Sequence, residues 1–199
     1  IKLIKEEHQL IISTGRIVNE DRKTIRALKY NQNDTNLFKD YVLKKTEILT
    51  PSVLFRRSYL QSKELFKTSL VRSQELELFS RLFYELKKSS FVKINQKGFL
   101  YIKHFNSKSN FDKSYISEYK YSHFYVHNEN WKRALVIKDV EIVNYCYSKI
   151  ISLLFSTLKF KDEKNRDLIL EQLRCKLTEK LFLKILLISK FVWVFDFSY

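Results

Sequence analysis

The chain has 199 residues, of which 37 are Lys or Arg and 22 are Asp or Glu, so its formal charge at pH 7 is +15. Hydrophobic residues make up 45% of the chain, which excludes a disordered basic tail, because such tails lack apolar side chains to bury. The two glycines, Gly15 and Gly98, are too few to build the glycine-rich loops of nucleotide-binding enzymes.

The first 36 residues are predicted to form an extended or irregular N-terminal segment. It ends in the polar stretch 31–36, whose composition is typical of loops and domain boundaries. Residues 37–90 are predicted to form a helical hairpin region. Thr50 and Pro51 are a helix-start signal within it. Apolar residues between 76 and 86 recur at steps of three and four, as they do on one face of a helix.

Residues 91–199 are predicted to form a domain of sheet and helices, and the alternative that they form one unit with residues 37–90 stays open. Residues 96–98 separate two β-prone runs, which is typical of a β-hairpin with its tip at Lys97 and Gly98. The sheet is expected to be small, central and antiparallel. Its candidate strands are residues 91–95, 99–105, 119–126 and 134–137.

Two long helices are predicted at the C-terminal end, over residues 140–158 and 163–190. Asp139 precedes the first helix, and Asp162 or Asn165 can cap the second, because Asp and Asn side chains accept hydrogen bonds from the first free amides of a helix. The last residues are a further strand candidate. The chain is therefore predicted to be an α+β protein with a helical N-terminal half, a small central antiparallel sheet and two long C-terminal helices.

The positive charge is spread along the chain, since residues 1–60, 61–130 and 131–199 each carry a net charge of +5. A folded surface this positive indicates an anionic partner. The densest patch, residues 87–120, interleaves lysines with aromatic residues. Lysines neutralise phosphates and exposed aromatics stack on unpaired bases, although the alternative that these aromatics form the core face of the sheet stays open. The candidate RNA-binding residues are Arg16, Arg22, Lys23, Arg26, Arg56, Arg57, Lys63, Lys87, Lys88, Lys93, Lys97, Lys103, Lys108 and Lys113.

No catalytic motif is present: the sequence has no P-loop, no nucleophile elbow and no zinc-protease signature. We therefore expect no enzyme activity, no cofactor and no small-molecule substrate. His123, His127, Cys146 and Cys175 lack the close pairing of structural zinc ligands, so no metal site is expected. The two cysteines fit a reducing compartment without a disulfide framework.

The C-terminal residues 181–195 include 12 apolar residues, interrupted by Lys184, Ser189 and Lys190. A membrane-spanning helix needs about 20 mostly apolar residues. A buried helix followed by a terminal strand is therefore the preferred interpretation of this segment.

The composition also bears on the origin of the gene. Phe, Tyr, Ile, Asn and Lys, whose codons are rich in A and T, make up 83 of the 199 residues, whereas Gly, Ala and Pro total five. This bias is typical of organellar, endosymbiont and parasite genes, and we expect a mitochondrial protein encoded in the organelle.

Charge, aromatic content and composition together predict a structural RNA-binding component of a mitochondrial ribosome. Its expected partners are rRNA and neighbouring ribosomal proteins. The alternative is an accessory subunit of a mitochondrial respiratory membrane complex, and only in that alternative is contact with a membrane expected.

Overall fold

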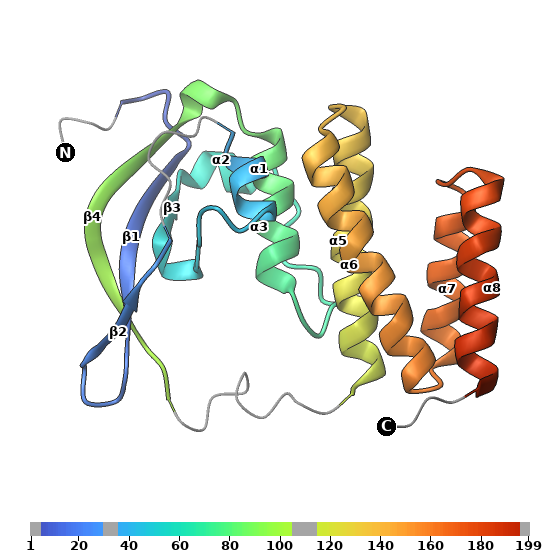
Figure 1. Cartoon of the computed structure of the whole chain (residues 1–199). Coiled ribbons are helices and arrows are strands. Elements are labelled where there is room, and N and C mark those ends of the chain that lie inside the picture. The colour runs from blue at the N-terminus through green and yellow to red at the C-terminus, as the bar shows by residue number, and fades with distance from the viewer. Residues whose placement is uncertain (1–4, 30–35, 105–114, 196–199) are drawn as a thin grey trace. The chain divides into compact units, whose positions relative to one another are not determined.

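The computed structural model describes residues 5–29, 36–104 and 115–195 (Figure 1). The chain forms two compact units. Unit 1 comprises residues 1–69 and 74–114, and unit 2 comprises residues 70–73 and 115–199. Unit 1 combines a sheet with helices and unit 2 is helical, so the α+β class is confirmed. The candidate residues Lys108 and Lys113 lie outside the described residues.

The sheet of unit 1 is built around one central strand, β1 (Leu10–Val18). The short strands β2 (Thr24–Ala27) and β3 (Val53–Phe55) pair antiparallel with opposite ends of β1, and neither is among the predicted strands. A fourth strand, β4 (Phe91–Ile102), runs parallel to β1 along its whole length. Three of the four strands come from the N-terminal part of the chain, so the expectations of a helical N-terminal half and of a central sheet are wrong.

The core of unit 1 lies between the sheet and two helices, α1 (Leu37–Val42) and α3 (Gln74–Glu85). Alternate residues of β1 are buried, as expected for a strand with one face on a core. Aromatic rings join the elements: Tyr41 of α1 lies 6.0 Å from Phe79 and 5.2 Å from Phe83 of α3, measured between ring centroids. The shorter elements are η1 (Thr50–Ser52), α2 (Arg57–Gln61) and η2 (Lys88–Ser90).

The predicted hairpin at residues 96–98 is wrong, because residues 91–102 form the single strand β4. Gly98, which indicated a turn, lies where β4 shifts register against β1. The β4 partners of Ser13, Thr14 and Gly15 are Ile94, Lys97 and Phe99, so residues of β4 are skipped at both steps. Gly15 is required there by close packing. A Cβ atom at this position would lie 2.5 Å from the ring of Phe99, so only glycine lets that ring cover the β1 backbone.

Unit 2 contains α5 (Ser117–Val136), α6 (Val140–Lys159), α7 (Glu163–Arg174) and α8 (Glu179–Phe195). The helix expected over 140–158 is confirmed as α6, and Asp139 caps it by accepting a hydrogen bond from the amide of Ile142 at 3.1 Å. The expected helix over 163–190 is divided into α7 and α8 by a short break at residues 175–178. Within the described residues, no helix combines the length and hydropathy needed to cross a bilayer.

The strands predicted over 119–126 and 134–137 are wrong, because both lie in α5. Their aromatic and β-branched residues favour strands locally, but tertiary packing overrides that preference. Ser122, Val126, Asn130 and Ala134 are all buried and recur every four residues, which is the spacing of a helix face and not of a strand. The prediction of a strand over the last residues is also wrong up to Phe195, because the residues up to that position belong to α8.

Candidate nucleic-acid interface

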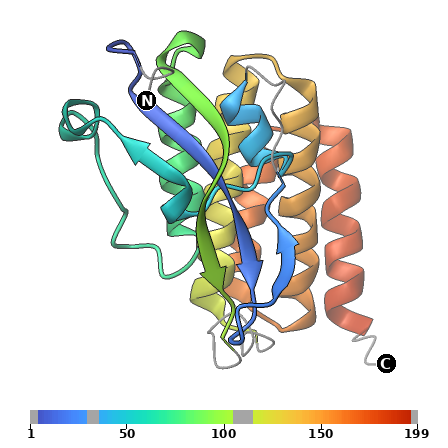
Figure 2. The same cartoon turned by 90° about the vertical axis from the view of Figure 1, so that its left-hand side faces the viewer.

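One face of the unit 1 sheet packs on α1 and α3, and no described helix of unit 1 covers the opposite face (Figure 2). We call the second face the outer face. Ile17 of β1 pairs with Arg26 of β2 on one side and with Tyr101 of β4 on the other, so these three side chains form a row on the outer face. The side chain of Tyr101 is 43% exposed, so its ring is accessible to a ligand.

Three of the candidate cations gather at the end of this sheet. Arg22 and Lys23 lie in the turn between β1 and β2, and Lys103 directly follows β4. The backbone amide of Lys103 donates to the carbonyl of Val18 at 2.8 Å, which places the end of β4 beside that turn. All three side chains are exposed and form no ion pair within the described part of the chain. We call Arg22, Lys23, Tyr101 and Lys103 the sheet-end cluster.

Acidic side chains are also present near the sheet-end cluster. Glu20 and Asp21 belong to the same turn as Arg22 and Lys23. Glu20 lies 3.5 Å from Nδ1 of His104, a contact that becomes an ion pair when the imidazole is protonated. Arg22 adopts a left-handed backbone with φ of 60°, and the turn is closed by hydrogen bonds from the amides of Arg22 and Lys23 to Asn19. The turn therefore presents its two cations from a backbone fixed by Asn19.

Three other candidate cations are paired within unit 1. Arg26 makes two hydrogen bonds to the carboxylate of Glu47, at 2.5 and 3.0 Å, and its guanidinium holds the pKa of Glu47 below the usual range. Arg56 donates to the backbone carbonyls of Glu6 and His8 at 2.7 and 3.1 Å. Lys63 lies 2.7 Å from Glu85. These contacts give Arg26, Arg56 and Lys63 structural roles.

Lys93, expected near a hairpin tip, is instead buried. Its side chain is 7% exposed and its ammonium lies 3.3 Å from the carboxylate of Asp40, whose side chain is fully buried. The register explains this position, because Lys93 pairs with Ile12 and so points to the core face of the sheet. Lys93 is therefore inaccessible to RNA in this structure.

The remaining candidates are scattered. Arg16 is half-buried on β1, Arg57 is the first residue of α2, and Lys87 and Lys97 are exposed. Lys88 lies in η2. The structure thus brings Arg22, Lys23 and Lys103 together and does not add the other candidates to that cluster.

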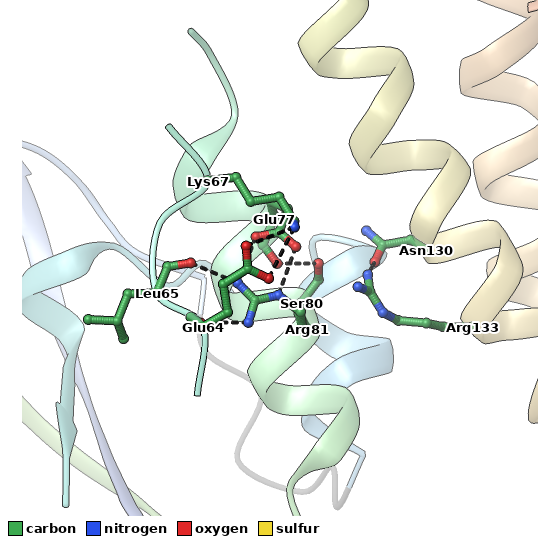
Figure 3. Close-up of polar contacts among 8 residues, drawn as sticks. All are labelled: Glu64, Leu65, Lys67, Glu77, Ser80, Arg81, Asn130 and Arg133. Carbon is green, nitrogen blue, oxygen red and sulfur yellow. Dashed lines mark hydrogen bonds and ion pairs between the residues drawn. The ribbon is translucent and has the colours of Figure 1, made fainter. Parts of the chain in front are cut away.

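Two further basic residues, Lys67 and Arg81, are paired within unit 1. Arg81 of α3 donates to the buried carboxylate of Glu77 at 2.8 and 3.0 Å, and to the carbonyls of Glu64 and Leu65 at 2.7 and 2.9 Å (Figure 3). Lys67 pairs with Glu64 at 3.1 Å. Arg81 thus holds the segment before α3 against the helix, and its positive charge is paired with the carboxylate of Glu77.

Unit 2 contains one unusual cation that sequence reasoning missed. Lys176 lies 4.7 Å above the ring of Trp131, and its ammonium donates to Oδ1 of Asn128. Burial, together with the nearby charge of Lys132, lowers the pKa of Lys176 to about 8. No spacing pattern could identify this lysine, because it lies between α7 and α8 while its partners are on α5, more than 40 positions away in the chain.

Cys146 and His123, two of the residues considered as metal ligands, lie in unit 2. Burial raises the pKa of the Cys146 thiol to about 12, so the thiol stays protonated and is a poor nucleophile at neutral pH. His123 contacts Ser73 Oγ at 2.8 Å through Nδ1. Among the residues that the structure describes, no three His, Cys, Asp or Glu side chains are grouped closely enough to hold a metal ion.

Comparison of the chain with models of protein families, with curated proteins and with solved structures found no match. The candidate interface therefore rests on the residues and their geometry.

Proposed function

We propose that this protein is a structural RNA-binding component of an organellar ribosome, in the mitochondrion, where its partners are rRNA and neighbouring ribosomal proteins. The observation that supports this most is the sheet-end cluster, in which exposed cations lie beside an accessible aromatic ring on the sheet face that no described helix of unit 1 covers. Unit 1, which carries the cluster, has 22 basic and 12 acidic residues, a formal charge of +10.

In this proposal, the sheet-end cluster binds RNA in two ways. Arg22, Lys23 and Lys103 neutralise phosphates and release condensed counterions, which supplies affinity without sequence selectivity. Tyr101 stacks on an unpaired base, as aromatic residues on exposed sheets do in other RNA-binding proteins. The protein transforms no substrate and needs no cofactor, because its role is to hold a charged surface in a fixed shape.

The ribosomal assignment draws on two further observations. Net positive charge is present in every third of the chain, which suits a folded protein with RNA on more than one side. The codon bias that favours Lys, Asn and Ile suits a gene in an organelle, where a ribosome is a major RNA-containing assembly.

Binding to single-stranded RNA over a series of salt concentrations tests the cluster. We expect the triple variant Arg22→Gln, Lys23→Gln, Lys103→Gln to lower the slope of log K against log salt by about two, since each phosphate contact contributes roughly 0.7. Tyr101→Ala should weaken binding roughly fivefold or more through lost stacking, with little change in that slope.

The matched control is Lys138→Gln, Lys164→Gln, Arg174→Gln, which removes the same charge from unit 2. It should retain most of the slope. Equal losses for the two triple variants would show that the cluster is not the binding site.

Sedimentation of the native protein from lysed organelles tests the ribosomal assignment. We expect the protein to migrate with rRNA and to be released by ribonuclease. If it stays with detergent-solubilised inner-membrane complexes after ribonuclease treatment, the second candidate, an accessory subunit of a respiratory membrane complex, is correct instead. The exposed apolar face of α8, described next, is the observation that favours this candidate.

A further inference from the structure

We propose that α8 docks along the surface of an anionic phospholipid bilayer. The proposal concerns unit 2 and does not depend on the RNA-binding function of unit 1. It starts from the exposed side of α8, where five large apolar side chains are between 40% and 68% exposed. They are Leu181, Leu183, Leu187, Ile188 and Phe191.

The neighbouring helix α7 has no such apolar exposure. The exposed residues of α7 are all charged, namely Glu163, Lys164, Asp167, Glu171 and Arg174, while Ile169 and Leu173 are buried. That is the usual pattern of a surface helix in water. In α8 the side that packs within unit 2 is mostly apolar too, since Ile185, Leu186 and Val192 are half-buried there beside the buried Ser189. Helix α8 is therefore apolar on both sides, and a contiguous exposed apolar patch marks an interaction site.

The charge on the same side of α8 indicates the kind of partner. Lys180, Lys184 and Lys190 are exposed among the apolar residues and form no ion pair within the described residues. The only acidic residue of the described helix is Glu179, in its first turn. A second copy of this face would bring lysines against lysines, which is unfavourable. The partner is therefore anionic.

Among anionic partners, a bilayer surface suits both the lysines and the exposed apolar side chains of α8. Nucleic acid would pair with the lysines but would leave the exposed Leu, Ile and Phe side chains without an apolar environment. A phospholipid surface offers phosphates above a hydrocarbon layer, and lysines can extend to the phosphates while neighbouring apolar side chains enter the acyl region.

The length of α8 fits this orientation. Its 17 residues span about 25 Å at a rise of 1.5 Å per residue, and no described helix meets the requirements for crossing a membrane. The helix would lie in the plane of the interface, with its inner side still packed against α6 and α7. No rearrangement of unit 2 is required.

Flotation of the full chain with lipid vesicles, without RNA, tests the proposal. The probes are vesicles of phosphatidylcholine alone and vesicles in which about a third of the lipid is phosphatidylglycerol, because basic residues are drawn to anionic lipid. We expect binding to the anionic vesicles. The variant Leu187→Ser, Phe191→Ser should weaken that binding about tenfold or more, since it removes two exposed apolar side chains.

Two matched controls localise the effect. Val136→Ser, Val140→Ser alters two equally exposed apolar residues at the turn between α5 and α6 and should bind as the native chain does. Lys180→Gln, Lys184→Gln, Lys190→Gln should lose roughly fivefold per lysine on anionic vesicles, whereas Lys138→Gln, Lys164→Gln, Arg174→Gln should lose much less. Circular dichroism confirms that each variant is folded.

Three results would overturn the proposal: no flotation with anionic vesicles, equal binding by the α8 variants and their controls, or a dimer in sedimentation equilibrium that Leu187→Ser, Phe191→Ser dissociates. The last result would assign the face to a second copy of the chain. Failure of flotation would leave the RNA-binding measurements unaffected, because those use variants of unit 1.

Discussion

At the scale of single residues, lysines that look alike in the sequence have different roles. Lys93 and Lys103 lie ten positions apart in one basic patch, yet Lys93 is buried against Asp40 and Lys103 is exposed at the end of β4. The direction of each side chain in the sheet decides the outcome. A buried charge needs a partner of opposite charge, because leaving it alone in the protein interior is costly.

We predict that Lys93→Met destabilises unit 1 by about 3–5 kcal/mol, because it removes the ammonium of Lys93 from the buried carboxylate of Asp40. Urea unfolding monitored by circular dichroism measures this. The double variant Asp40→Asn, Lys93→Met should recover most of the loss, since both charges are then removed. A loss of less than about 1 kcal/mol in the single variant would contradict a buried ion pair.

Lys176 allows a prediction about pH. Its pKa is lowered to about 8 by burial and by Lys132, from a usual value of 10.5. Between those two pH values the unfolded chain binds a proton that the folded chain has released, so this residue makes folding more favourable as the pH rises. A ¹³C titration of the lysine side chains should give one midpoint near 8, absent in Lys176→Met. A Lys176 midpoint above 10 would contradict the environment described for it.

At the scale of elements, helix caps were predictable because they are local. Asp162 caps α7 by accepting from the amide of Asn165 at 3.1 Å. Its other carboxylate oxygen accepts from Tyr115 Oη at 2.6 Å, Ser117 Oγ at 2.8 Å and Asn165 Nδ2 at 2.7 Å. The sequence indicated the cap but not Tyr115 and Ser117, which belong to the segment that begins α5 and lie far from Asp162 in the chain.

We predict that Asp162→Ala lowers the free energy of unfolding of unit 2 by about 2–3 kcal/mol. The variant loses the helix cap and also removes the acceptor for the hydrogen bonds from Tyr115, Ser117 and the Asn165 side chain. Burial raises the pKa of Asp162, but the hydrogen bonds from Tyr115, Ser117 and Asn165 outweigh burial and lower it below 3.8. The corresponding stabilisation is present above pH 3.8 and is lost as the pH falls through the folded pKa. Urea unfolding at pH 7 and below pH 3.8 measures both effects. Equal acid sensitivity of the native chain and Asp162→Ala would contradict this assignment.

Strands were harder to predict than helices and caps. The run at 119–126 favours a strand by composition, but its residues at every fourth position are buried in α5. The run at 91–102 is a strand, yet its partner is β1, near the other end of unit 1's sequence. Helix periodicity can be seen within a segment, whereas a strand is completed by hydrogen bonds to another segment.

At the scale of the whole molecule, the two units differ in charge and in exposed surface. Unit 1 carries a net charge of +10 and the sheet-end cluster, whereas unit 2 carries +5 and the apolar face of α8. The two proposed partners, RNA and a bilayer surface, therefore require different surfaces of the chain.

Hydrogen–deuterium exchange of the full chain tests this division. We predict that single-stranded RNA slows exchange in residues 19–23 and 103–104, and that anionic vesicles slow it in residues 179–192. Exchange of amides already protected in the sheet should change little, so the exposed turn should respond most. Protection of α8 by RNA without protection of the β1–β2 turn would contradict the assignment of the two surfaces.

The α+β class, the helices α3 and α6 and the caps at Asp139 and Asp162 could be predicted from the sequence, because helices and caps depend on residues within a few positions of one another. The sequence also determined the excess of positive charge. Only the tertiary structure decided which cations are accessible. Arg26 and Glu47, Lys93 and Asp40, and Lys176 and Asn128 are each separated by 21 or more positions in the chain, so their pairing depends on how the strands and helices pack.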